Sequence, residues 1–219
     1  MNTAIITAGG IGKRMNSKIP KQFLLLGGIP ILMRSIQAFH TFDQSIEILV
    51  TLPKDWWSYW NELCEKHEFK IPVTLIEGGK ERFHSVQKAV EVAKGEVIAV
   101  HDGVRPLVSI ETIDRAFQRA EQKGSGVPVV RLKDSLRKGS FDENTAVRRD
   151  DYLLIQTPQC FKSEWIKKAY SQHEFSSEIT DDATLIEKSG KPIFLTEGNE
   201  ENIKITSPMD LRIATLLGE

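Results

Sequence analysis

Short apolar runs alternate with helical segments along most of the chain, and this alternation is the feature that most constrains the fold. Five runs have the composition of strands and are mostly apolar on both faces: 3–8, 46–52, 73–78, 96–102 and 125–130. Helical periodicity runs between them, through 30–41, 54–68, 81–94 and 109–122. Strands that are apolar on both faces need helices on either side. We therefore predict a Rossmann-like, doubly wound α/β fold with a mostly parallel sheet.

Size and charge narrow the class of protein. The chain has 219 residues, 40% of them hydrophobic, and a formal net charge of −1. This is enough apolar material for one sizeable core, so we expect a single domain over 1–219. Balanced charge argues against a protein that coats nucleic acid or a membrane surface. The longest apolar run, FLLLGGIPILM, is too short to span a bilayer, and the first residues lack a signal peptide's features.

Cysteine usage indicates a reducing compartment. The two cysteines, Cys64 and Cys160, have no CxxC spacing and no accompanying histidine cluster. A disulfide scaffold and a structural zinc site are therefore not expected. Together with the missing leader, this pattern predicts a soluble cytoplasmic protein.

The alternation breaks at 131–150, a polar and charged segment with turn residues around 139–144. The segment could form either a disordered loop or a β-hairpin. The alternation of apolar and polar residues in RLKDSLRK favours a hairpin arm that leaves the main body. An arm with little core of its own needs a partner surface, so we expect a homodimer. The chain returns through 152–159 and the helical segments 163–174 and 181–189. It ends with strand-like 202–206 and a helix whose N-cap, N1 and N3 residues are Ser207, Pro208 and Asp210.

A glycine-rich loop with four cations, TAGGIGKRMNSKIPKQF (7–23), follows the first predicted strand. A P-loop would need Ser or Thr where this chain has Arg14. A dinucleotide-binding loop would need Gly or Ala where this chain has Met15. The remaining interpretation is a loop that wraps a nucleoside triphosphate, with glycines for close approach and positive φ. Arg14 and Lys21 would neutralise charge on the phosphates, although a plain turn with solvated lysines is the simpler alternative for the glycines alone.

Asp102 ends the apolar run 96–102, where the chain leaves the predicted sheet. Its carboxylate has two open roles, holding Mg²⁺ on a triphosphate or bonding a substrate hydroxyl. We interpret the neighbouring His101 as a packed imidazole rather than a base. Aromatic residues Trp56, Trp57 and Trp60 are interpreted as packing, and TDDA (180–183) as a helix N-terminus with acids in its first turn.

Several motifs resemble, in sequence order, those of one enzyme family. AGGIGKRM followed by PKQF resembles the sugar-nucleotidyltransferase signature in its cytidylyltransferase version. The further matching motifs are EGGKERFHSV (77–86), VHDGVRP (100–106), IQTPQ (155–159), ITDDA (179–183) and NIKIT (202–206). Together they are most similar to the 2-C-methyl-D-erythritol 4-phosphate cytidylyltransferase family, over nearly the whole chain.

The resemblance implies the nucleotide-diphospho-sugar transferase type of fold and an enzyme of the non-mevalonate isoprenoid pathway. Such an enzyme transfers CMP from CTP to a polyol phosphate, methylerythritol 4-phosphate, and releases pyrophosphate. It implies Mg²⁺, or another divalent cation, as cofactor. It also implies that the arm 131–150 is the dimerisation element.

The same resemblance implies three groups of site residues. The catalytic group is Arg14, Lys21, Asp102 and Lys204, with Asp102 as the metal ligand. The CTP-binding group is Ala8, Gly9, Gly10, Gly12, Gly78, Gly79, Arg82 and Ser85, with hydrogen bonds from Gly78 and Gly79 to the cytosine edge. The acceptor-binding group is Arg105, Ser135, Arg149 and Thr157, with Ser135 supplied by the partner subunit's arm.

Two departures and three alternatives remain. Family members usually have Thr at the position of Ser135 and Ala at the position of Gly103. Ribitol 5-phosphate cytidylyltransferase shares the nucleotide loop, although ERFHSV and ITDDATLIEKSG are more similar to the isoprenoid enzymes. A non-catalytic nucleotide sensor would be expected to lack Arg14, Lys21 or Asp102. An oxidoreductase would conflict with Met15.

Overall fold

The computed structural model describes residues 1–10 and 19–218, so the predicted site residues Gly12 and Arg14 lie outside the described residues. Within them, eight strands form one sheet in the order β10-β7-β11-β6-β1-β4-β5, with β12 beside β7. Their bounds are β1 Thr3–Thr7, β4 Glu47–Leu52, β5 Thr74–Glu77, β6 Val97–Asp102, β7 Ser125–Arg131, β10 Leu153–Ile155, β11 Gln159–Lys162 and β12 Leu195–Glu197. Strands β1, β4, β5 and β6 are mutually parallel, whereas β10 and β11 run antiparallel to their neighbours. The predicted mostly parallel sheet is confirmed.

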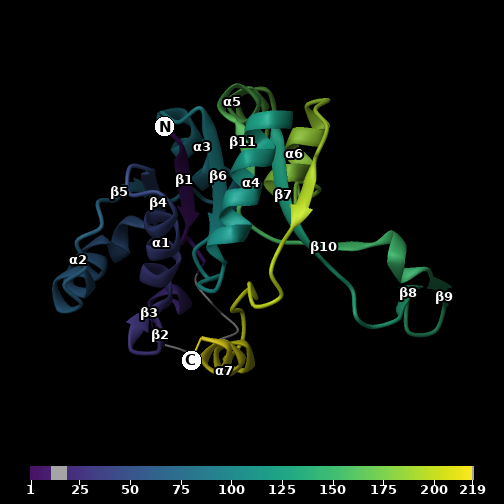
Figure 1. The fold of residues 1–219 in the computed structure, drawn as a ribbon, viewed down its shortest axis with the longest axis horizontal. Coiled ribbons are helices and arrows are strands. Elements are labelled where there is room, and N and C mark those ends of the chain that lie inside the picture. Colours follow the sequence, from purple (N-terminus) through teal and green to yellow (C-terminus); the bar gives the residue numbers. More distant parts are fainter. Residues whose placement is uncertain (11–18, 219) are drawn as a thin grey trace.

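Helices cover both faces of this sheet (Figure 1). Their bounds are α1 Ile31–Phe42, α2 Trp57–Lys66, α3 Arg82–Val92, α4 Ile110–Lys123, α5 Ser163–Gln172, α6 Asp182–Lys188 and α7 Pro208–Leu217. Short 3₁₀ helices lie at Lys21–Phe23, Lys54–Trp56 and Arg149–Asp151, and a small ladder joins β2 Leu25–Leu26 to β3 Ile29–Pro30. No helix in the described part of the chain is both long and apolar enough to cross a membrane.

Alternate residues of the central strands pack into two different hydrophobic cores, one on each face of the sheet. In β1, Ala4 and Ile6 pack on the face covered by α1, α2 and α4, and Ile5 packs on the face covered by α3, α5 and α6. This period of two explains why the strands read as apolar throughout. Trp60 is 1% exposed in the first of these cores, which confirms that the tryptophans near it serve packing.

The segment after β7 leaves the body as an arm and returns at β10. Its outer part is a two-stranded hairpin, β8 Leu136–Gly139 with β9 Asn144–Val147. Figure 1 shows this hairpin projecting well away from the sheet. Gly139, with φ of +132°, closes the hairpin at its turn end. Nearly all side chains of the hairpin are exposed or half-buried, so it has no core of its own.

The C-terminal segment differs from prediction in one element. The strand expected at 202–206 does not form, and β12 lies earlier in the chain. A buried asparagine, Asn202, and a single backbone bond from Ile205 N to Val104 O (2.9 Å) hold the segment in place of a ladder. The following helix α7 begins as predicted, with a capping box between Ser207 and Asp210.

Candidate active site

A cleft of about 410 Å³ opens at the carboxyl ends of β1, β4, β5 and β6. This is where open α/β sheets bind ligands. The predicted site residues that line it are Ala8, Gly9, Gly10, Lys21, Gly78, Gly79, Arg82, Ser85, Asp102 and Lys204. They come from five separate segments of the sequence, three of which follow or end the parallel strands β1, β5 and β6.

The loop after β1 is held at Ala8, the residue before the glycines. Ala8 N donates to Thr51 O (2.9 Å), and the buried Gln22 side chain donates to Ala8 O (2.6 Å). Gly9 and Gly10 do not adopt the positive φ that the sequence suggested, and a Cβ at either would meet only ordinary contacts. Their small size therefore keeps this wall of the cleft open. Sequence reasoning missed Gln22, although it lies within the quoted PKQF motif.

The loop after β5 is packed too closely at Gly79 for a side chain. Gly78 N donates to Leu52 O (3.1 Å) and Gly79 N donates to Ser85 Oγ (2.9 Å), while Ser85 Oγ donates to Glu81 O (3.1 Å). A Cβ on Gly79 would lie 3.0 Å from Ser85 N and closer still to His84 Cβ, so only glycine fits. Both N–H groups are used within the protein, which leaves carbonyl oxygens to meet a ligand. Ser85 shapes this loop.

Three cations surround Asp102 at the base of the cleft. Its Oδ2 lies 3.0 Å from Lys204 Nζ and 3.3 Å from Arg105 Nε, and its Oδ1 lies 3.8 Å from Arg82 Nε. Burial alone would raise the pKa of Asp102, but the charges of Arg82, Lys204 and Arg105 outweigh it and hold the pKa well below its usual range. Asp102 is therefore ionised at any physiological pH. Lys21 lies near this group, with Nζ donating to Ile205 O (3.0 Å).

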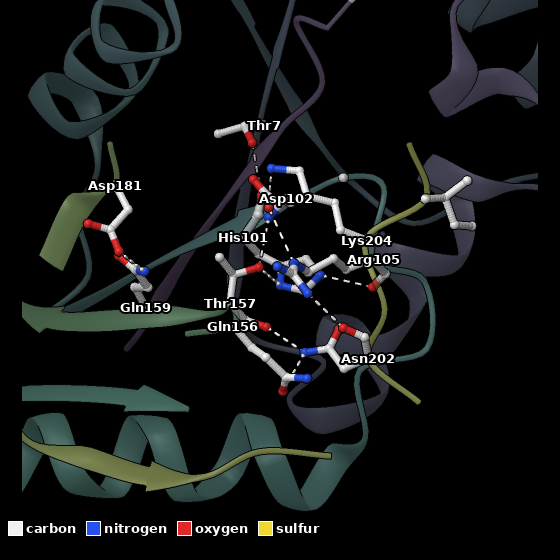
Figure 2. A network of polar contacts seen from close by, with 12 residues as sticks. Thr7, His101, Asp102, Arg105, Gln156, Thr157, Gln159, Asp181, Asn202 and Lys204 are labelled. Atoms are coloured by element: carbon white, nitrogen blue, oxygen red, sulfur yellow. Dashed lines mark hydrogen bonds and ion pairs between the residues drawn. The ribbon is translucent and has the colours of Figure 1, made fainter. Parts of the chain in front are cut away.

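A chain of hydrogen bonds behind Asp102 orients the ring of His101 (Figure 2). His101 Nε2 lies 3.1 Å from Arg105 O, and a carbonyl only accepts, so Nε2 carries the hydrogen. Nδ1 then accepts from the Thr157 hydroxyl (3.0 Å), and Thr157 Oγ1 accepts from Asp102 N (3.1 Å). Burial lowers the pKa of His101 to about 4. The prediction of a packed imidazole is confirmed, since the ring is 0% exposed and edge-on to Phe39.

The predicted acceptor-binding residues Arg105 and Thr157 lie behind Asp102 and do not line the cleft. Arg105 Nη1 donates to Asn202 O (2.7 Å), and its side chain is 13% exposed. Asn202 Nδ2 donates to Thr157 O (2.8 Å) (Figure 2). These contacts tie the 202–206 segment to Asp102 and so position Lys204. Asn202 was not predicted, because an Asn beside alternating apolar and polar residues in NIKIT gives no sign of burial.

The two remaining predicted acceptor residues lie on the arm. Ser135 and Arg149 do not line the cleft of their own chain. Arg149 Nη1 donates to Lys133 O, so it braces the base of the arm, and half of its side chain is exposed.

The motif interpreted as a helix N-terminus has a second contact. Asp181 is the N-cap of α6, with its carboxylate accepting from Thr184 N (2.9 Å), as predicted. Asp182, the next residue, accepts from Arg82 Nη2 (2.7 Å) with its side chain 0% exposed. Sequence reasoning missed this link between α6 and the cleft, because nothing in the pattern joins positions 82 and 182.

The donor set at Asp102 fits a metal ion that is held mainly by a nucleotide. Residues 1–10 and 19–218 contain no cluster of three or more His, Cys, Asp or Glu that could cage a metal. The ionised carboxylate of Asp102 lies at the base of the cleft, and its Oδ1 is the oxygen farther from the surrounding cations. Mg²⁺ keeps several waters and needs only one or two carboxylates when phosphates supply the other ligands.

Comparison with known proteins matches residues 2–218 to the family model described as IspD: 2-C-methyl-D-erythritol 4-phosphate cytidylyltransferase. The protein of that name from Bacteroides fragilis is 46% identical over 216 residues, which cover 98% of each chain. The solved enzyme of that name from Thermus thermophilus is 30% identical with a TM-score of 0.81, covering 99% of this chain and 98% of that one. The bifunctional IspDF from Campylobacter jejuni is 33% identical with a TM-score of 0.80, covering 96% of this chain but only 53% of that longer one.

Proposed function

Because this chain belongs to the 2-C-methyl-D-erythritol 4-phosphate cytidylyltransferase family, we propose that the cleft beside Asp102 is where it binds both of its substrates. The chain is a cytidylyltransferase. It transfers CMP from CTP to 2-C-methyl-D-erythritol 4-phosphate, giving 4-diphosphocytidyl-2-C-methyl-D-erythritol and pyrophosphate, in the non-mevalonate isoprenoid pathway. The observation that carries the site assignment is one ionised carboxylate held among three cations at the base of a glycine-lined cleft.

The charge of the cleft suits a triphosphate. The charged side chains that line it are the cations Lys21, Lys80, Arg82 and Lys204 and the carboxylates Glu81 and Asp102. An excess of fixed positive charge stabilises the triphosphate and the extra charge that develops as pyrophosphate leaves. We assign Lys21 and Lys204 to this stabilisation, and extend the same role to Arg14.

The reaction needs positioning and charge rather than a base. An oxygen of the acceptor phosphate forms a bond to the α-phosphorus of CTP, and the bond from that phosphorus to the bridging oxygen breaks. The electron pair leaves with pyrophosphate. Because the acceptor phosphate is ionised at neutral pH, no proton has to be removed. This agrees with His101, whose two ring nitrogens are engaged and buried.

Asp102 is the residue that would hold Mg²⁺ on the triphosphate. The ion would neutralise phosphate charge and orient the leaving group. Arg105 and Asn202 would fix the position of Asp102 and Lys204 from behind.

The loop after β5 would select the base. Because the N–H groups of Gly78 and Gly79 already donate within the protein, its carbonyl oxygens would accept from the exocyclic amino group of cytosine. Uracil has a carbonyl at that position and would face oxygen with oxygen. Ser85 would keep the loop in this conformation.

A homodimer through the arm would complete the acceptor site. Ser135 and Arg149 do not line the cleft of their own chain, so a partner's arm is the means by which Ser135 would reach the acceptor phosphate. The base of the arm supports a partner surface, because Leu153, Leu154 and Ile155 are between 39% and 51% exposed. We place the enzyme in the cytoplasm, where CTP is available.

Pyrophosphate release from CTP and Mg²⁺ tests the assignment. We expect turnover with methylerythritol 4-phosphate and none with ribitol 5-phosphate. Lys21→Ala should lower kcat by about 100-fold or more, since one fixed charge at a developing anion is worth a few kcal/mol. The control is Lys123→Ala, an exposed lysine in the last turn of α4. Turnover with ribitol 5-phosphate alone would show that the acceptor has been assigned wrongly. Equal losses of kcat in Lys21→Ala and Lys123→Ala would refute the role of Lys21.

Mixed dimers test the arm. Ser135→Asp should block the acceptor site by placing a carboxylate against its phosphate. If the arm acts on the partner's cleft, mixing inactive Lys21→Ala with inactive Ser135→Asp chains should restore about a quarter of wild-type activity, because half the dimers are mixed and each has one complete site. No recovery on mixing would show that the arm serves its own chain.

A further inference from the structure

Arg82 lies between two carboxylates of different kinds. Its Nη2 donates to Asp182 Oδ2 (2.7 Å), and its Nε lies 3.8 Å from Asp102 Oδ1, beyond a direct hydrogen bond. Asp182 belongs to the first turn of α6, outside the cleft lining, whereas Asp102 is the carboxylate at the cleft base. The Arg82 side chain is 34% exposed and lines the cleft, while Nη2 is bonded to the fold through Asp182.

Asp182 is held rigidly for this contact. Its other oxygen, Oδ1, accepts from the Tyr170 hydroxyl (2.6 Å), and Asp182 itself is 1% exposed. The Tyr170 ring packs against Phe83, the residue after Arg82, with ring centroids 4.9 Å apart. Burial raises the pKa of Tyr170 well above its usual value, so the hydroxyl stays a donor. A carboxylate with both oxygens engaged and no access to water has one position available to it.

We propose that Asp182, fixed by Tyr170, is a positioning residue that holds Arg82 toward the triphosphate and keeps it from closing on Asp102. This inference rests on the assignment of Arg82 and Asp102 to the CTP site.

The reason lies in the geometry around Asp102. Its Oδ2 already contacts Lys204 and Arg105, so Oδ1 is the oxygen left for the metal ion or substrate. Arginine forms strong two-pronged hydrogen bonds with carboxylates, and Asp102 is the other carboxylate within 4 Å of Arg82 among the described residues. Without Asp182, the guanidinium would close the 3.8 Å gap and occupy Oδ1. The bond to Asp182 therefore keeps both Arg82 and Asp102 available.

The test is a double-mutant cycle between Asp182→Asn and Arg82→Gln, with kcat and the KM for CTP measured separately. Asp182→Asn should lower kcat by about 10- to 100-fold, the value of a charge-assisted hydrogen bond. Arg82→Gln should raise the KM for CTP. The double variant should have the kcat of Arg82→Gln alone rather than the product of both losses, because no guanidinium is left to occupy Asp102.

Asp181→Asn is the matched control, since this neighbouring carboxylate caps α6 and accepts from Gln159 Nε2 (2.8 Å; Figure 2), whereas the ion pairs of Arg82 are with Asp102 and Asp182. It should lower the melting temperature, because an amide nitrogen would replace the oxygen that accepts from Gln159 Nε2, and it should leave kcat within about twofold. Tyr170→Phe, which keeps the ring and the Asp182 charge, should change kcat in the same direction as Asp182→Asn by a smaller factor. If Asp182→Asn does not fold, the double-mutant cycle of Tyr170→Phe with Arg82→Gln tests the inference in its place.

Losses that multiply in the double variant would overturn the inference, as would an Asp182→Asn variant that changes only melting temperature. Calorimetric CTP affinity gives a readout that does not depend on turnover: Arg82→Gln should weaken it, and unchanged affinity and kinetics would refute the placement of Arg82. Absence of turnover by the wild-type chain would instead overturn the proposed function, and this inference with it.

Discussion

Acid should destabilise this fold through one buried histidine. His101 has a pKa of about 4 in the folded protein, against an ordinary value of 6.5, because burial disfavours the imidazolium. Protonation would put a hydrogen on Nδ1, which accepts from the Thr157 hydroxyl, while Nε2 already donates to Arg105 O. Between pH 6.5 and 4, His101 is therefore protonated in the unfolded chain but stays neutral in the folded chain. Stability must fall as pH is lowered through this window.

The magnitude follows from the two pKa values. Lowering the pH from 7 to 5 should cost about 2 kcal/mol of unfolding free energy through His101 alone. The nearby Asp102 does not mask this. Its pKa lies below the ordinary 3.8, so its contribution is present above that value and is lost only at lower pH.

Urea unfolding at pH 7, 6 and 5 would measure the effect in wild type and in His101→Gln. The variant removes the titrating group but keeps an amide that can donate and accept. The other four histidines are common to both proteins, so their contributions cancel in the difference. We expect the wild type to lose about 2 kcal/mol more than the variant between pH 7 and 5. An imidazole that titrates near 6.5 by NMR, or equal pH slopes in both proteins, would refute the reasoning.

Three further substitutions test the geometry. Gly79→Ala should raise the KM for CTP about tenfold or more, because a Cβ would clash with the backbone at Ser85 and displace the loop; steady-state kinetics would show it. Gly103→Ala should cost about 1–3 kcal/mol in urea unfolding, because a Cβ would lie 3.0 Å from Thr7 O. An unchanged midpoint would show that this packing relaxes. Ser207→Ala should cost about 1 kcal/mol through the lost cap of α7, and equal melting temperatures would contradict that cap.

The parallel core could be predicted because its signal is local. Runs such as 96–102 are apolar at every position only when both faces are covered, and alternate residues do enter two different cores. Capping residues act within one turn, so Ser207 and Asp210 located a helix start correctly. The antiparallel strand β11 was not predicted, since strand direction depends on where the chain travels between strands and not on the strand's own residues.

In the cleft, too, local motifs could be predicted from the sequence, whereas long-range contacts could not. The sequence suggested Asp102 and Lys204 by motif, and the structure brings them to 3.0 Å. The predicted strand around Lys204 was wrong, because Asn202 and Arg105 hold that segment through side-chain contacts with residues far away in the sequence. Arg105 was expected to bind the acceptor, which stays a prediction; the structure shows its contacts with Asp102 and Asn202 O.

By itself, the sequence determined the class of fold, the edge of the sheet where the cleft opens and the kinds of charge found there. Hydrophobic period, glycine placement and helix caps are local properties, so they can be read without coordinates. Tertiary structure alone decided how those charges are shared: that Asp182 takes one edge of Arg82, and that His101 stays neutral between a hydroxyl and a carbonyl. Both depend on distances between segments that only packing brings together, and electrostatic energy depends on those distances and on burial.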